Sequence, residues 1–130
     1  MKIKLFRSCM TASEILFSAG FVPYLNDFSV NHFGISRSIP VQGEEAQSVS
    51  RIEVWFTQNP QENSVSIRVV GPEKSLVPDA IFQVDPEDAS RFTANLGRFL
   101  SSGEYEVIWR GIGQDGHVVN GDWDFSVAGQ

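Results

Sequence analysis

The sequence predicts an all-β fold, a β-sandwich with Greek-key connections. Short runs rich in valine and phenylalanine alternate apolar with polar residues, which is the period-two pattern of half-buried strands. Eleven glycines and six prolines separate these runs at the spacing typical of an all-β domain. No amphipathic helix of useful length lies between them. Together these observations favour two packed sheets over a helical architecture.

The clearest element is a predicted hairpin over residues 100–127, two strands joined by a short glycine-rich turn. One face of it carries alternating large apolar side chains: Tyr105, Val107, Trp109, Trp123, Phe125 and Val127. We expect four aromatic residues in the core, namely Phe56, Tyr105, Trp109 and Phe125. The turn contains Asp115-Gly116-His117, the only place where a histidine and a carboxylate are two residues apart. If the chain has chemistry, we expect it there.

Shorter strands precede this hairpin. Residues 32–50 are expected to form an edge strand followed by a loop, because proline and glycine interrupt them. Further strands are predicted over residues 51–57, 64–70, 80–84 and 92–100. One helical turn is expected within residues 85–92, since Asp85 suits a helix N-cap and Pro86 suits the first helical position.

Composition indicates one domain, residues 32–130, preceded by an N-terminal extension. At 130 residues the chain can bury a core without disulfides, and its single cysteine, Cys9, excludes an internal disulfide and a cysteine-based zinc site. The net charge is −6, and from residue 32 onward 7 Lys and Arg stand against 14 Asp and Glu. An acidic body repels phosphate groups, which argues against nucleic acid or an anionic membrane surface as the main partner.

Residues 1–31 differ from the rest of the chain. A basic start is followed by an apolar stretch over residues 15–25, which is the outline of a secretory signal peptide. The pattern is degenerate, because Glu14 and Asp27 flank the stretch and no Ala-x-Ala cleavage site follows it. No run approaches the roughly 20 apolar residues of a membrane span. The segment is either cleaved as a signal or retained as an extension, and the sequence favours neither.

Several blocks of residues carry a family resemblance. Near the C-terminus they are Leu100, Gly103, Tyr105, Val107, Trp109 and Arg110, then Asp115, His117 and Gly121, then Trp123, Phe125 and Val127. Near the start, His32 is followed by Ser38, Pro40 and Gly43, and a strand over residues 52–58 also fits. Residues 32–128 thus resemble the CopC-type periplasmic copper-resistance domain family.

The chain departs from that family pattern at three positions. Phe99 and Val118 stand in place of proline, and Gln58 stands in place of an acid. The resemblance implies an Ig-like β-sandwich of about seven to nine strands, exported to the periplasm. It further implies a protein that is not an enzyme but binds one Cu(II) ion and sequesters or transfers it. The implied partners are the copper ion and a membrane copper transporter, without nucleic acid, and we expect a monomer.

Carried over residue by residue, the metal ligands that the resemblance implies are His32, Asp115 and His117. The family's N-terminal histidine binds through its α-amine as well as its imidazole, so the amine ligand requires cleavage before His32. Neutral imidazole and carboxylate suit the preference of Cu(II) for nitrogen and oxygen donors. On extended backbone, Asp115 and His117 would point to the same side and reach one ion. A methionine-rich Cu(I) site is not implied, since Met1 and Met10 both precede the domain.

Three other interpretations stay open. Asp115-Gly116 is a common turn dipeptide, so it can serve only to close the hairpin. The fold can also persist as a metal-free Ig-like interaction module. A copper-dependent oxidase is the weakest alternative: some monooxygenases also hold copper through an N-terminal histidine and a second histidine, but no substrate-binding aromatic platform is visible here. Neither histidine lies in a motif that would activate a nucleophile, which argues against an enzyme of that other kind.

Overall fold

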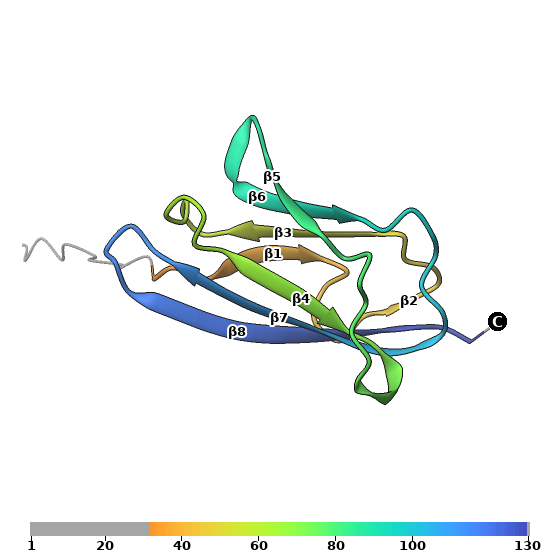
Figure 1. The fold of residues 1–130 in the computed structure, drawn as a ribbon. Coiled ribbons are helices and arrows are strands. Elements are labelled where there is room, and N and C mark those ends of the chain that lie inside the picture. Colours follow the sequence, from red (N-terminus) through yellow and green to blue (C-terminus); the bar gives the residue numbers. More distant parts are fainter. Residues whose placement is uncertain (1–31, 130) are drawn as a thin grey trace, which may run out of the picture. The chain divides into compact units, whose positions relative to one another are not determined.

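The computed structural model describes residues 32–129, which fold into a sandwich of two four-stranded sheets (Figure 1). The first sheet has the order β1–β3–β6–β5, with β1 (Ile35–Ile39), β3 (Arg51–Phe56), β5 (Phe82–Asp85) and β6 (Asp88–Asn95). The second has the order β2–β8–β7–β4, with β2 (Glu45–Ala46), β4 (Ser66–Val70), β7 (Gly103–Ile112) and β8 (Val118–Val127). A 3-10 helix, η1 (Pro72–Lys74), follows β4. No helix in this part of the chain is long and apolar enough to cross a membrane.

The predicted all-β sandwich is confirmed, and its eight strands lie within the expected range. Consecutive strands often change sheet: β3 and β4 lie in different sheets, as do β6 and β7. Such crossovers are typical of Ig-like sandwiches. β1 is an edge strand, as predicted, whereas the two-residue β2, which pairs in parallel with β8, was not expected.

The predicted core is also confirmed. Phe56, Tyr105, Trp109 and Phe125 are between 3 and 6 % exposed. The remaining inward-facing residues of the β7–β8 hairpin, Val107, Trp123 and Val127, are buried with them. All the side chains of this core come from residues 33–127, so the described residues have a two-sheet core of their own. A domain of about 100 residues is large enough to fold alone.

One local prediction is wrong: residues 85–92 form no helical turn. β5 and β6 form a hairpin instead, and aspartates shape its turn. The Asp85 carboxylate accepts a hydrogen bond from the backbone N–H of Glu87 at 2.8 Å, and Asp88 Oδ1 accepts one from the backbone N–H of Ser90 at 3.0 Å. An aspartate that bonds the backbone two residues on favours a turn as readily as it caps a helix. β6 therefore begins at Asp88, earlier than the predicted strand.

Phe33 closes the core at the end where the β7–β8 turn lies. Its side chain is 5 % exposed, stacks on Phe56 with ring centroids 4.9 Å apart, and meets Trp109 edge-on at 6.0 Å. Two glycines lie directly against it: a Cβ added at Gly111 would be 2.8 Å from Phe33 Cε1, and one at Gly113 would be 2.9 Å from Phe33 Cβ. The segment before β1 therefore fits against the end of β7 because neither glycine has a side chain.

A buried carboxylate, Glu53, lies on the outer face of the first sheet. Its side chain is 10 % exposed, and both Arg51, at 2.6 Å, and Arg91 contact its Oε1. Arg91 also contacts Asp85 at 3.0 Å and lies over the Trp55 ring. Burial raises the pKa of Glu53, but the hydrogen bond from Arg91 and the charges of both arginines outweigh burial and hold that pKa below its ordinary value of 4.5. The folded state thus stabilises the carboxylate form.

We predict that acid weakens the fold through Glu53. Because the folded pKa is lower than the unfolded one, the stabilisation is complete above the unfolded pKa and is lost as the pH falls through the folded pKa. Glu53→Gln removes the charge and should lower the free energy of unfolding at neutral pH by about 1–3 kcal/mol. Urea unfolding of both proteins at a series of pH values should show this difference shrinking below about pH 5.

Asp79→Asn is the matched control, because Asp79 and Arg98 form an ion pair whose side chains are 46 % and 48 % exposed. Such a pair contributes about 0–1 kcal/mol, so this variant should follow the wild type at every pH. A difference between the wild type and Glu53→Gln that stays constant down to about pH 3 would contradict the stabilisation of Glu53 as a carboxylate.

We also predict that Gly113→Ala destabilises the domain by about 1–3 kcal/mol, the usual effect of overpacking a core. The new Cβ would lie 2.9 Å from Phe33 Cβ and 3.2 Å from Asp115 Oδ1. Gly129→Ala is the control, because a Cβ there meets no atom within 4 Å. Thermal unfolding compares the two variants, and equal midpoints would contradict the close packing of Phe33.

Candidate functional site

Asp115 and His117 lie in the turn between β7 and β8. The backbone N–H of Gly113 donates to the carbonyl of His117 at 3.1 Å and closes this turn. Gly116 has a φ of +86°, a left-handed conformation that glycine adopts without strain. The expectation of extended backbone at residues 115–117 is therefore wrong, because the chain reverses direction there.

The two side chains nevertheless face each other. Asp115 Oδ1 accepts a hydrogen bond from the backbone N–H of His117 at 3.0 Å, and Asp115 Oδ2 lies 2.9 Å from His117 Nδ1. Since an ionised carboxylate only accepts hydrogen bonds, Nδ1 of the neutral imidazole carries the proton and Nε2 keeps its lone pair. Metal-binding histidines are commonly oriented by a carboxylate in this way. Asp115 thus orients His117 and fixes its tautomer.

This pair is open to solvent, with the His117 side chain 83 % exposed and the Asp115 side chain 60 % exposed. The hydrogen bonds from the backbone N–H of His117 and then from its imidazole hold the pKa of Asp115 below its ordinary value of 3.8. Asp115 is therefore ionised throughout the neutral range. The turn presents a carboxylate and an imidazole nitrogen together, a combination that attracts a cation.

His32 lies at the same end of the sandwich. It is exposed and is the first described residue. Its neighbour Phe33 packs against Gly111 and Gly113, which lead into the turn that carries Asp115. Figure 1 shows the start of the described chain beside the β7–β8 turn. Two segments that are far apart in the sequence therefore meet at this end.

The three predicted ligands are not assembled into a finished site. Within residues 32–129, no three His, Cys, Asp or Glu side chains are grouped so that they could hold a metal ion. The structure brings Asp115 and His117 together and pairs them with each other, whereas His32 does not join them in a cluster. A metal ion that uses all three would have to draw the His32 side chain toward the turn. It would also have to break the Asp115–His117 bond, because the lone pair of Nε2 points away from the carboxylate that Nδ1 contacts.

The residues that follow β3 contact both segments, and the sequence did not single them out as functional. Thr57 Oγ1 donates to the carbonyl of His32 at 2.9 Å and accepts from the backbone N–H of Gly34 at 3.1 Å. Gln58 Oε1 accepts from the backbone N–H of Gln114 at 3.2 Å. Bonds from side chain to backbone leave no periodic signal in a sequence, so Gln58 attracted notice only as a departure from the family pattern.

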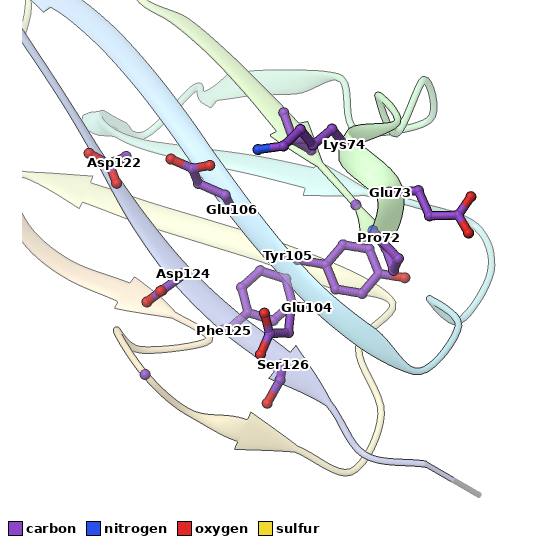
Figure 2. Close-up of a pocket in the computed structure, with 13 residues that line it drawn as sticks. Pro72, Glu73, Lys74, Glu104, Tyr105, Glu106, Asp122, Asp124, Phe125 and Ser126 are labelled. Carbon is purple, nitrogen blue, oxygen red and sulfur yellow. The ribbon is translucent and has the colours of Figure 1, made fainter.

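A second charged feature lies on the outer face of the β7–β8 hairpin, away from the turn. Figure 2 shows a hollow there, beside η1, whose lining includes acidic side chains from both strands: Glu104, Glu106, Asp122 and Asp124. Glu106 and Asp124 lie directly opposite each other in the β7–β8 register. These carboxylates account for part of the acidic charge of the domain, but among the described residues they form no group that could hold a metal ion.

Comparison with known proteins adds to this picture. The family model of the CopC domain matches residues 35–128. No curated protein matches the chain. A solved structure of CopC from Methylosinus trichosporium OB3b is 20 % identical with a TM-score of 0.65, covering 76 % of this chain and 96 % of that one. A structure of PcoC, a methionine-rich copper resistance protein from Escherichia coli, is 19 % identical with a TM-score of 0.62, covering 75 % of this chain and 99 % of that one.

At these identities the two structures establish the fold, and nearly all of each is covered by this chain. The family model is evidence about the family as well as the fold, because it matches most of the sequence. The matched residues include the turn with Asp115 and His117. Its match begins after His32. The chain therefore belongs to the CopC domain family.

Proposed function

We propose that this protein acts in copper resistance by binding one Cu(II) ion, which it sequesters or hands on. The proposed ligands are His32, Asp115 and His117. The observation that carries the proposal is the Asp115–His117 pair, an oriented imidazole beside an ionised carboxylate within the part of the chain that matches the CopC domain. Its exposure suits a carrier, since an ion can enter and leave without unfolding the domain.

Donor chemistry favours Cu(II) as the cargo. His117 supplies a nitrogen and Asp115 an oxygen, and His32 would add a second imidazole. Cu(II) prefers such nitrogen and oxygen donors in a tetragonal arrangement. Cu(I) prefers thioether and thiolate ligands, and residues 32–130 contain neither methionine nor cysteine.

We propose further that residues 1–31 are a leader that is removed on export to the periplasm. Removal would leave residues 32–130 as the mature domain and would free the α-amine of His32, a strong nitrogen donor. With that amine the site offers three nitrogens and one oxygen, which suits a tetragonal Cu(II) ion. The mature domain would act as a monomer, without catalysis, and pass copper to a membrane transporter.

A metal-free interaction module is the second candidate. Two observations support this second candidate. Residues 32–129 contain no group of three side chains that could hold a metal ion, and the Asp115 carboxylate and the His117 imidazole already form a hydrogen bond with each other. In that case Asp115 serves only to close the turn, and the sandwich presents its faces to a protein partner.

Titration with Cu(II) of the full chain and of a form beginning at His32 separates the two candidates. We expect the shorter form to bind one equivalent in competition with a chelator and to give a Cu(II) EPR spectrum with nitrogen coupling. The full chain should bind more weakly, because residue 32 then offers an amide nitrogen in place of an amine. Circular dichroism checks that both forms are folded.

Single substitutions in the shorter form identify the ligands. His117→Ala should abolish tight binding, and Asp115→Asn should weaken it by about 10- to 100-fold, because Asp115 also orients the imidazole. Asp124→Asn is the matched control, since it removes a carboxylate from the same hairpin at the position opposite Glu106. Absence of binding by both forms, or binding that His117→Ala leaves intact, would contradict the proposal.

A further inference from the structure

We infer that Thr57 is the positioning residue of this site, because its hydroxyl group holds the backbone of residue 32 in place at the end of the sandwich where the Asp115–His117 turn lies. The inference rests on the proposed copper function and identifies a residue that determines how the two halves of the site meet. Thr57 acts through His32 and is not itself a ligand.

Thr57 bonds to the segment that carries His32 through both its side chain and its backbone. Its hydroxyl donates to the carbonyl of His32 at 2.9 Å and accepts from the backbone N–H of Gly34 at 3.1 Å. Its backbone N–H donates to the carbonyl of Gly34 at 2.8 Å. A hydroxyl has one proton to donate and lone pairs that accept, so both side-chain bonds can form at once. They extend the β1–β3 pairing beyond its last pair, Ile35 with Phe56.

The next two residues hold the other half of the site. Gln58 Oε1 accepts from the backbone N–H of Gln114 at 3.2 Å, and Gln114 Nε2 donates to the carbonyl of Asn59 at 2.6 Å. Gln114 directly precedes Asp115 in the turn. Residues 57–59 therefore bond to the His32 segment on one side and to the turn on the other, and they set the position of each relative to the other.

The hydroxyl of Thr57 is needed because Phe33 fixes only its own position. The Phe33 ring is held in the core, whereas His32 lies one residue outside it and is exposed. Ordering an exposed residue when a ligand binds has an entropic cost. The hydrogen bond from Thr57 to the carbonyl of His32 already orders this backbone in the metal-free protein, so less entropy is lost when the ion binds. The bond should therefore strengthen copper binding.

Thr57→Val tests the inference, because valine is also β-branched but has no hydroxyl. Thr57→Ser restores the hydroxyl without the methyl group. Thr93→Val is the matched control, since Thr93 lies in the middle of the sheet, on β6 opposite Glu53. Each variant is made in the full chain and in the form beginning at His32.

We expect Thr57→Val to weaken Cu(II) binding by about tenfold or more and to change the Cu(II) EPR spectrum, because a displaced His32 alters the donor set. Thr57→Ser should restore both the affinity and the spectrum, and Thr93→Val should change neither. In the metal-free protein, the backbone amide of Gly34 should exchange its hydrogen faster in Thr57→Val than in the other variants, since it loses its acceptor.

Two results would overturn the inference. The first is wild-type copper affinity and a wild-type EPR spectrum in Thr57→Val. The second is unchanged hydrogen exchange at Gly34 in the same variant. The hydrogen-exchange measurement is made without copper. It therefore tests whether the Thr57 hydroxyl holds the Gly34 backbone even if the protein binds no copper. Failure of the wild type to bind copper would instead count against the proposed function.

Discussion

The Phe33 ring stacks on Phe56 and meets the edge of Trp109, and two glycines at the end of β7 leave the space that it fills. Truncating a buried aromatic residue of this kind typically destabilises a protein by about 3–5 kcal/mol. The start of the domain is therefore anchored in the core, even though residues 32–34 belong to no strand. This packing and the hydrogen bonds from Thr57 to residues 32 and 34 together hold His32 at the end of the sandwich that carries the β7–β8 turn.

Two carboxylates show how differently this fold uses its acidic residues. Glu53 is buried, and arginines hold its pKa low, so its charge contributes to the stability of the first sheet. Asp115 is exposed, and hydrogen bonds from His117 hold its pKa low, so its charge orients a neighbouring imidazole. The proposed ligands are thus exposed groups that contribute little to the core. The packing of Phe33 and the hydrogen bonds of residues 57–59 hold the segments that carry them.

Alternation of apolar residues was enough to predict the sandwich, the β7–β8 hairpin and its buried aromatic side chains, because burial of one strand face imposes a period of two. Phe33 has no periodic partner, so its place in the core could not be read from the chain alone. Asp85 was ambiguous, since the same side chain caps helices and closes turns. Asp115 and His117 attracted notice from their spacing alone, and the resemblance added the role of metal ligands. Their hydrogen-bonded geometry depends on a turn that the pattern did not predict, and the contacts of Thr57 depend on segments that only the folded chain brings together.

The number of imidazoles bound to copper tests the central claim most directly. Pulsed EPR on the form beginning at His32, loaded with one equivalent of Cu(II), counts them through the modulation from the remote ring nitrogen. If the two segments meet at one ion, the spectrum will show two coupled imidazoles, those of His32 and His117. A single coupled imidazole, or none, would contradict a site in which His32 and His117 bind the same ion.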